Sequence, residues 1–171
     1  MRIKLSFLPA LILSLIFISC QKENASTGNN DPVNQNTTGF NVNAELLLKL
    51  VNDVRQSGCN CGSTAMPPVA PVTWNALLAK AAYDHSADMQ AKDYFDHTGL
   101  DGSTPGTRIT NAGYTWKTYG ENIASGYTSE TAVINGWLTS EGHCLNIMNA
   151  NFKEMGAGRA GNYWTQEFGT R

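Results

Sequence analysis

The sequence predicts an α+β fold, in which helices precede a β-hairpin that ends the chain. Apolar residues recur at helical spacing between residues 43 and 92, and the pattern changes to alternation after residue 154. Helices followed by a terminal hairpin predict a sheet that is covered by helices. With 171 residues, the chain is long enough for one domain with a substantial core.

The first 19 residues are typical of a secretory signal. Arg2 and Lys4 precede an apolar run over residues 5–18, shorter than the about 20 residues that a membrane-spanning helix needs. The run ends in Ser19-Cys20, which resembles the lipobox of bacterial lipoproteins, although Phe17 stands where Leu is usual. We expect residues 1–19 to be removed and Cys20 to be acylated. The alternative is an ordinary secretory signal with an incidental Cys.

Residues 20–39 are predicted to be the lipidated Cys and a flexible linker. Five of residues 21–39 are Asn, and Ala25 and Val33 are the only apolar side chains among them. Such a segment buries too little surface to offset its ordering entropy. It would tether a domain at residues 40–171 near a membrane, with a reach of roughly 25 Å.

Two amphipathic helices are expected to open the domain. Asn43 is a suitable N-cap for the first and Gly58 a suitable stop, and Asn75 caps a second helix that runs to about Lys92. Prolines between them, at positions 67, 68 and 71, exclude helix there.

The middle of the domain, residues 98–127, is rich in Gly, Thr and Asn and interrupts the periodic pattern. One short helix is expected within it, capped by Thr104 with Pro105 at its first position. A further helix is predicted over residues 129–138. Strands are then predicted over residues 155–159 and 163–170, around the turn Ala160-Gly161-Asn162.

Composition excludes several classes of function. Only 15% of the residues are charged, and the net charge is −2 at pH 7. Without a basic excess, a nucleic-acid partner is disfavoured. The Gly and Pro residues follow no period, which excludes collagen-like and repeat architectures.

The three histidines are the first candidates for chemistry. His85 lies on the apolar stripe of the second helix and is interpreted as a core residue. His97 and His143 each follow a predicted helix in Gly-containing backbone, and Glu121 lies in a similar segment. Two imidazoles and a carboxylate can hold Zn²⁺ with an open water position, act as general base and acid, or form a hydrogen-bonded structural network. Spacing alone leaves these three possibilities open, and no nucleophile motif such as Gly-x-Ser-x-Gly is present.

The cysteines predict one disulfide. In an exported protein Cys144 should be oxidised. A bridge within Cys59-Asn60-Cys61 would be strained, so Cys144 is expected to pair with Cys59 or Cys61. Either bridge would close a loop of some 83 to 85 residues. Closing such a loop stabilises the fold by about 4.6 kcal/mol in the chain-entropy account. One thiol would remain free.

A succession of motifs resembles the CAP superfamily (SCP-like domains), which includes cysteine-rich secretory proteins, venom allergens and plant pathogenesis-related proteins. The resemblance covers about residues 43–169. It rests on residues 81–89, Phe95-Asp96-His97, Gly120-Glu121-Asn122-Ile123-Ala124, Ser140-Glu141-Gly142-His143, Asn146-Ile147-Met148, Met155-Gly156-Ala157-Gly158 and residues 163–169.

The resemblance implies a three-layer α-β-α sandwich with a cleft lined by two His and up to two Glu. His97 and His143 match the cleft histidines, and Glu121 matches the Glu of the Gly-Glu-Asn motif. The second Glu would be Glu141, one position late relative to many members. In some members the two His bind zinc or another divalent cation, so His97 and His143 are the candidate metal ligands.

The resemblance implies several possible functions. We expect an exported binding module, lipid-anchored to the bacterial cell envelope at the outer membrane or cell surface. Its cleft would take a lipid, peptide or glycan of the envelope or exterior, and it would meet the membrane only through its acyl chains. The alternative is a divalent-metal-dependent hydrolase, protease-like, in which His97, Glu121, His143 and Glu141 are catalytic. A third interpretation makes the cluster a purely structural clamp.

Overall fold

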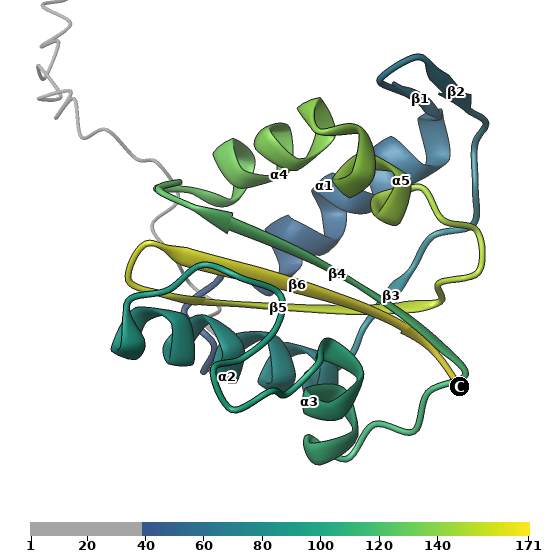
Figure 1. Ribbon diagram of the computed structural model, residues 1–171. Helices are drawn as coiled ribbons and strands as arrows, with labels where there is room; N and C mark the ends of the chain where they lie inside the picture. Colours follow the sequence, from purple (N-terminus) through teal and green to yellow (C-terminus); the bar gives the residue numbers. More distant parts are fainter. Residues whose placement is uncertain (1–38) are drawn as a thin grey trace, which may run out of the picture. The chain divides into compact units, whose positions relative to one another are not determined.

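The computed structural model describes residues 39–171, which form a three-layer α-β-α sandwich (Figure 1). The predicted signal segment, Cys20 and the linker up to residue 38 lie outside the described residues. Within residues 39–171, no helix combines the length and apolar character needed to cross a membrane. One face of the central sheet is covered by α1 (Ala44–Ser57), α4 (Glu130–Thr139) and α5 (Glu141–Ile147), and the other by α2 (Ala76–Lys92) and α3 (Pro105–Asn111).

The central sheet has the strand order β3-β5-β6-β4. β5 (Glu154–Ala160) and β6 (Tyr163–Thr170) form the predicted hairpin, and β4 (Thr118–Ser125) pairs antiparallel with β6. The short strand β3 (Thr73–Trp74) pairs parallel with β5. A separate two-stranded hairpin consists of β1 (Cys59–Cys61) and β2 (Thr64–Met66). β4 is therefore an edge strand, with side chains reaching both helical layers.

Side-chain caps begin four of the helices where the sequence predicts them. In α1, α2, α3 and α4 an Asn, Thr or Ser side-chain oxygen accepts a hydrogen bond from a backbone N–H of the first turn. These bonds satisfy amide groups that have no partner within the helix. The caps are Asn43, Asn75, Thr104 and Ser129.

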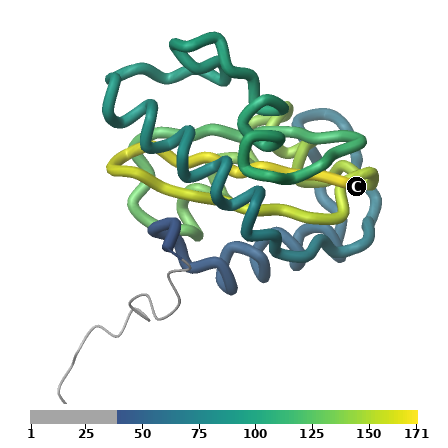
Figure 2. The backbone as a smooth tube through the Cα atoms, turned by 90° about the horizontal axis from the view of Figure 1, so that it is seen from below, coloured from purple at the N-terminus to yellow at the C-terminus, as the bar shows by residue number. Residues whose placement is uncertain are grey.

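α2 packs closely against the sheet, and Figure 2 shows it crossing β5 and β6. Gly156 and Gly158 make this approach possible, because a Cβ at either position would collide with the backbone of α2 at Ala79 or Tyr83. The alternating Gly residues of β5 thus determine the distance of α2 from the sheet, and with it the position of His85 relative to the sheet.

Several elements differ from the sequence prediction. Glu121 lies on a regular strand, β4, and not in irregular Gly-rich backbone. His143 lies on α5, a short helix that begins directly after α4, and not in a loop. The strands β1, β2 and β3 were also not predicted. The strands β1, β2 and β3 and the helix α5 are too short to show a periodic pattern. β4 acquires its strand structure by pairing along the whole of β6.

Candidate functional site

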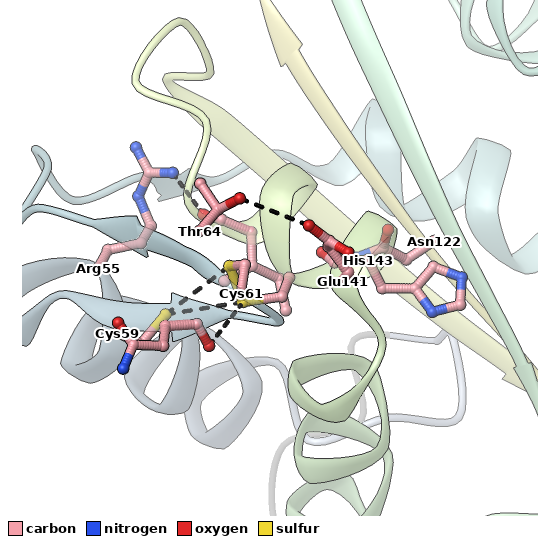
Figure 3. The surroundings of a disulfide bond; sticks show 10 residues. Arg55, Cys59, Cys61, Thr64, Asn122, Glu141 and His143 are labelled. Atoms are coloured by element: carbon pink, nitrogen blue, oxygen red, sulfur yellow. Dashed lines mark hydrogen bonds between the residues drawn. A yellow bond between two sulfur atoms is a disulfide. The ribbon is translucent and has the colours of Figure 1, made fainter.

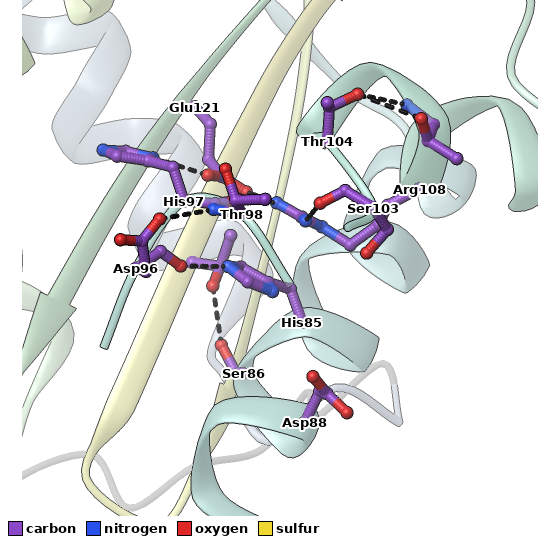
Figure 4. Close-up of polar contacts among 12 residues, drawn as sticks. His85, Ser86, Asp88, Asp96, His97, Thr98, Ser103, Thr104, Arg108 and Glu121 are labelled. Atoms are coloured by element: carbon purple, nitrogen blue, oxygen red, sulfur yellow. Dashed lines mark hydrogen bonds and ion pairs between the residues drawn. The ribbon is translucent and has the colours of Figure 1, made fainter. Parts of the chain in front are cut away.

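Glu121 is the centre of a network of charged groups between β4 and the α2–α3 layer (Figure 4). Its Oε1 lies 2.6 Å from Nδ1 of His97, and its Oε2 accepts a hydrogen bond of 2.6 Å from Nη2 of Arg108. The Glu121 side chain is 2% exposed and that of Arg108 is 9% exposed, whereas His97 is 51% exposed. The network therefore presents one imidazole to solvent and holds it from beneath with a buried ion pair.

Arg108 also fixes the backbone around the site. Besides Glu121, its guanidinium donates to the carbonyl oxygens of His97 and Ser103, at 2.9 and 3.0 Å. The loop that carries His97 is thereby tied to α3, on which Arg108 lies. The sequence analysis did not identify Arg108 as a site residue, because an isolated Arg on a short helix gives no signal of its contacts.

The electrostatics of the pair favour a charged imidazole. The hydrogen bond to Glu121 raises the pKa of His97, and this effect outweighs the partial burial that opposes it. Burial alone would raise the pKa of Glu121, but the hydrogen bond with His97 and the charge of Arg108 lower it overall. Glu121 is thus ionised at neutral pH, and both of its oxygens are engaged.

Glu167 is a second carboxyl group in this layer that the sequence analysis did not include among the candidates. It lies directly opposite Glu121 in the β4–β6 register and is completely buried. Its burial, followed by the charge of Glu121, raises the pKa of Glu167 well above the ordinary value. Glu167 is therefore kept neutral beside an ionised neighbour. The alternation of β6 puts Glu167 on the same face of the strand as Thr165. That Glu167 lies opposite Glu121 follows only from the register of β6 with β4.

His85 lies next to this network within the α2 layer. It is 1% exposed, as its position on the apolar stripe predicts, and its Nε2 lies 2.9 Å from the carbonyl oxygen of Asp96. Burial lowers the pKa of His85, so the ring is neutral at neutral pH. A neutral ring with Nε2–H donating to Asp96 secures the segment just before His97.

His143 reaches the site from the other helical layer. Asn122, which neighbours Glu121 on β4 but faces α5, donates to the His143 carbonyl oxygen at 3.2 Å. Asn146 on α5 in turn donates to the Glu121 carbonyl and to Oδ1 of Asn122. Burial, and then the charge of nearby His97, lower the pKa of His143. His97 and His143 thus belong to segments on opposite faces of the sheet, with the edge strand β4 between them.

Glu141 has other contacts. Its carboxyl group lies beside Gly62 and 3.4 Å from Oγ1 of Thr64, in the β1–β2 hairpin (Figure 3). The structure gives it no hydrogen bond or ion pair with His97, Glu121 or His143 within residues 39–171. Glu141 is the first residue of α5, and its side chain points to the hairpin. His143 lies two residues further along the helix, so its side chain points in another direction.

The three cysteines form a compact cluster at the end of α1. Cys61 and Cys144 are joined in a disulfide, one of the two predicted pairings, with their Cα atoms 5.4 Å apart. Cys59 is the free thiol. Within residues 39–171, these are the one set of three His, Cys, Asp or Glu residues whose ligand atoms all lie within 4.8 Å of one another, close enough that they could hold a metal ion. The disulfide occupies two of the three sulfur atoms.

Residues 48–168 match the CAP family, described as the cysteine-rich secretory protein family. The chain belongs to this family. An uncharacterized protein of Bacillus subtilis, YkwD, is 40% identical over 100 residues, which are 57% of this chain and 39% of YkwD. This CAP domain therefore spans well under half of that relative.

Solved structures show the same CAP fold. An extracellular SCP-domain protein of Bacillus anthracis has a TM-score of 0.67 and 29% identity, over 75% of this chain and 40% of that one. An outer surface protein of Borrelia burgdorferi has a TM-score of 0.64 and 22% identity, over 74% and 91% of the two chains. A more distant structure, NaASP2 with Zn²⁺, has a TM-score of 0.50 and 16% identity, over 73% and 77%. The fold of this chain is thus the one that these CAP-domain structures share.

Proposed function

We propose that this CAP protein is an exported binding module, anchored through acyl chains on Cys20, whose ligand contacts His97 and His143. The observation that carries the proposal is the half-exposed His97 imidazole, whose Nδ1 is held by the buried Glu121–Arg108 pair so that Nε2 is left for a ligand. An oriented imidazole with a raised pKa is a hydrogen-bond donor that suits a ligand presenting acceptor oxygens, as phosphates, carboxylates and sugar hydroxyls do. A lipid headgroup, a peptide or a glycan of the envelope would supply them.

The hydrogen bonds around the histidines favour binding over covalent catalysis. Within residues 39–171, no hydroxyl or thiol side chain is hydrogen-bonded to His97 or His143. An imidazole that activates a nucleophile would need such a neighbour. Glu121 is also occupied at both oxygens, so it supports His97 and is not a free general base.

A metal-dependent function is the second candidate, and one observation favours it. Histidines that bind metals commonly donate their other ring N–H to a carboxylate, and Nδ1 of His97 has this relationship with Glu121. Nε2 of His97 and the ring of His143 would then be the metal ligands, with water completing the shell. A bound divalent cation would supply Lewis-acid activation of that water.

Binding is tested with the full chain carrying Cys20→Ser, so that acyl chains do not insert into membranes. The probes are soluble peptidoglycan fragments, phosphatidylethanolamine/phosphatidylglycerol vesicles and a mixture of extended peptides. We expect one probe to bind, with affinity reduced at least about tenfold in His97→Ala and His143→Ala. Lys49→Ala, at an exposed position on α1, is the matched control. Equal binding by all variants, or binding of none of the probes, contradicts the proposal.

The metal alternative has a separate test. Calorimetric titration of Zn²⁺ uses oxidised protein carrying Cys20→Ser and Cys59→Ser, in which no thiol remains to bind zinc. Stoichiometric binding that is lost in both His97→Ala and His143→Ala supports a joined site, and hydrolysis would then be assayed with and without chelator. Absence of binding by the folded parent protein excludes the zinc site. Labelling with radioactive palmitate, lost in Cys20→Ser, tests the anchor.

A further inference from the structure

The free thiol of Cys59 lies against the disulfide that joins the β1–β2 hairpin to α5. Its Sγ is 3.6 Å from Sγ of Cys144 and 3.9 Å from Sγ of Cys61 (Figure 3). Thiol–disulfide exchange proceeds by attack of a thiolate on a disulfide sulfur, so the three atoms needed for the reaction are already in contact.

Strand geometry explains why two cysteines face one partner. Cys59 and Cys61 are two positions apart on β1, and side chains at that spacing point to the same side of a strand. Their Cα atoms are consequently separated by about 6.6 Å along the strand. Cys144, on α5, lies opposite both. A change of partner would need movement of the short hairpin past α5 and no refolding of the sheet.

The surroundings of Cys59 leave room for that movement. A hollow of about 280 Å³ is lined by Val54, Gly58, Cys59, Leu138 and Cys144, so the residue that carries the free thiol and its neighbour Cys144 lie at the wall of the same hollow. Cys61 and Cys144 are completely buried, whereas Cys59 is partly exposed. In the structure Cys61 is paired with Cys144, which leaves the free thiol at the more accessible position.

We propose that Cys59 exchanges with Cys61 as the disulfide partner of Cys144, so that this CAP domain contains a thiol–disulfide exchange site. The Cys59 thiol loses its proton, and its sulfur bonds to Sγ of Cys144. The Cys61–Cys144 bond breaks, and the Cys61 thiolate takes up a proton. One disulfide and one thiol are present before and after, so no oxidant or reductant is consumed.

The exchange has a structural consequence for the candidate site. Cys144 directly follows His143, and both lie on α5. Exchange moves the attachment of α5 by two residues along β1. The helix that bears His143 can therefore be linked to β1 at either of two positions, Cys61 or Cys59.

The experiment uses the full chain with Cys20→Ser throughout. The parent protein then has three cysteines, and each further variant has two. Cys61→Ser should fold and form the Cys59–Cys144 disulfide on air oxidation, leaving no titratable thiol. Cys59→Ser is the matched control, in which Cys61–Cys144 forms and no thiol remains. A folded Cys61→Ser protein that retains two titratable thiols overturns the proposal.

The parent protein provides a measurement that does not depend on the folding of Cys61→Ser. After incubation under native conditions it is quenched with acid, denatured, alkylated at low pH and digested without reduction. Mass spectrometry should detect a minor fraction of Cys59–Cys144 cross-linked peptide beside the major Cys61–Cys144 peptide. Detection of Cys61–Cys144 alone, at every incubation time, overturns exchange even if Cys59 can bridge to Cys144 in the variant.

Discussion

Glu121 and Glu167 are cross-strand partners on β4 and β6, and their pKa values move in opposite directions. Two adjacent buried carboxyl groups cannot both ionise cheaply. Glu121 takes the charge because His97 and Arg108 bond to it, and Glu167 stays neutral because it is fully buried beside that charge. The site is therefore supported from beneath by a neutral acid.

Glu167→Gln tests this assignment, because the amide is a neutral group of the same shape. At about pH 4, where Glu167 is protonated in both the folded and the unfolded chain, we expect the free energy of unfolding of Glu167→Gln to lie within about 1 kcal/mol of the parent, whereas Glu167→Ala should lose about 2–4 kcal/mol through the cavity it leaves. A raised folded-state pKa costs stability as the pH rises above the ordinary value for Glu. Denaturant titrations at several pH values measure this cost. As the pH rises above about 4.5, the free energy of unfolding should fall less steeply for Glu167→Gln than for the parent. Equal slopes would show that Glu167 is not held neutral.

The histidines should titrate in two groups. Nuclear magnetic resonance of the imidazoles should give His97 a pKa above about 6.5, and His85 and His143 values below it. Glu121→Gln should lower the pKa of His97, and Glu45→Gln, an exposed change on α1, should leave it unchanged. The His97 contribution to stability is complete below about pH 6.5 and is lost as the pH rises through the raised pKa. A His97 pKa that does not respond to Glu121→Gln contradicts the network.

Arg55 is a buried cation that joins α1 to the segment after α5. It is completely buried, and its guanidinium donates to the carbonyl oxygens of Ala70, Ile147, Asn149 and Phe152. Arg55→Met should destabilise the protein by about 3–5 kcal/mol, because four carbonyl oxygens lose their donor and two of them, at Ile147 and Phe152, are buried. Urea unfolding measures the loss, with the exposed Lys49→Met as control. A loss below about 1 kcal/mol would mean that water replaces the guanidinium.

Two glycines should respond in opposite ways to Ala. At Gly156 a new Cβ would meet the backbone of α2, so Gly156→Ala should cost roughly 1–3 kcal/mol. At Gly142, on α5, nothing lies within 4 Å of a new Cβ, and Gly142→Ala should gain up to about 1 kcal/mol from helix propensity. Thermal unfolding compares the two. Equal effects would show that α2 does not depend on the close approach.

Features that depend on local contacts could be predicted from the amino-acid sequence. The caps at Asn43, Asn75, Thr104 and Ser129 fix helix starts through bonds that span three residues or fewer, so they can be read without the fold. The alternation in β6 likewise predicted the terminal hairpin. The resemblance of the motifs to CAP domains added the three-layer arrangement and pointed to His97, Glu121 and His143.

How these residues are used depends on the packing of distant segments. Arg108 and Glu167 join Glu121 through contacts 13 and 46 residues away in sequence, set by helix packing and by the β4–β6 register. Glu141 points to the β1–β2 hairpin because α5 begins there, and Cys61 was selected over Cys59 by the position of α5 against β1. Such choices are made when separate chain segments pack together, and no short window of sequence contains both partners.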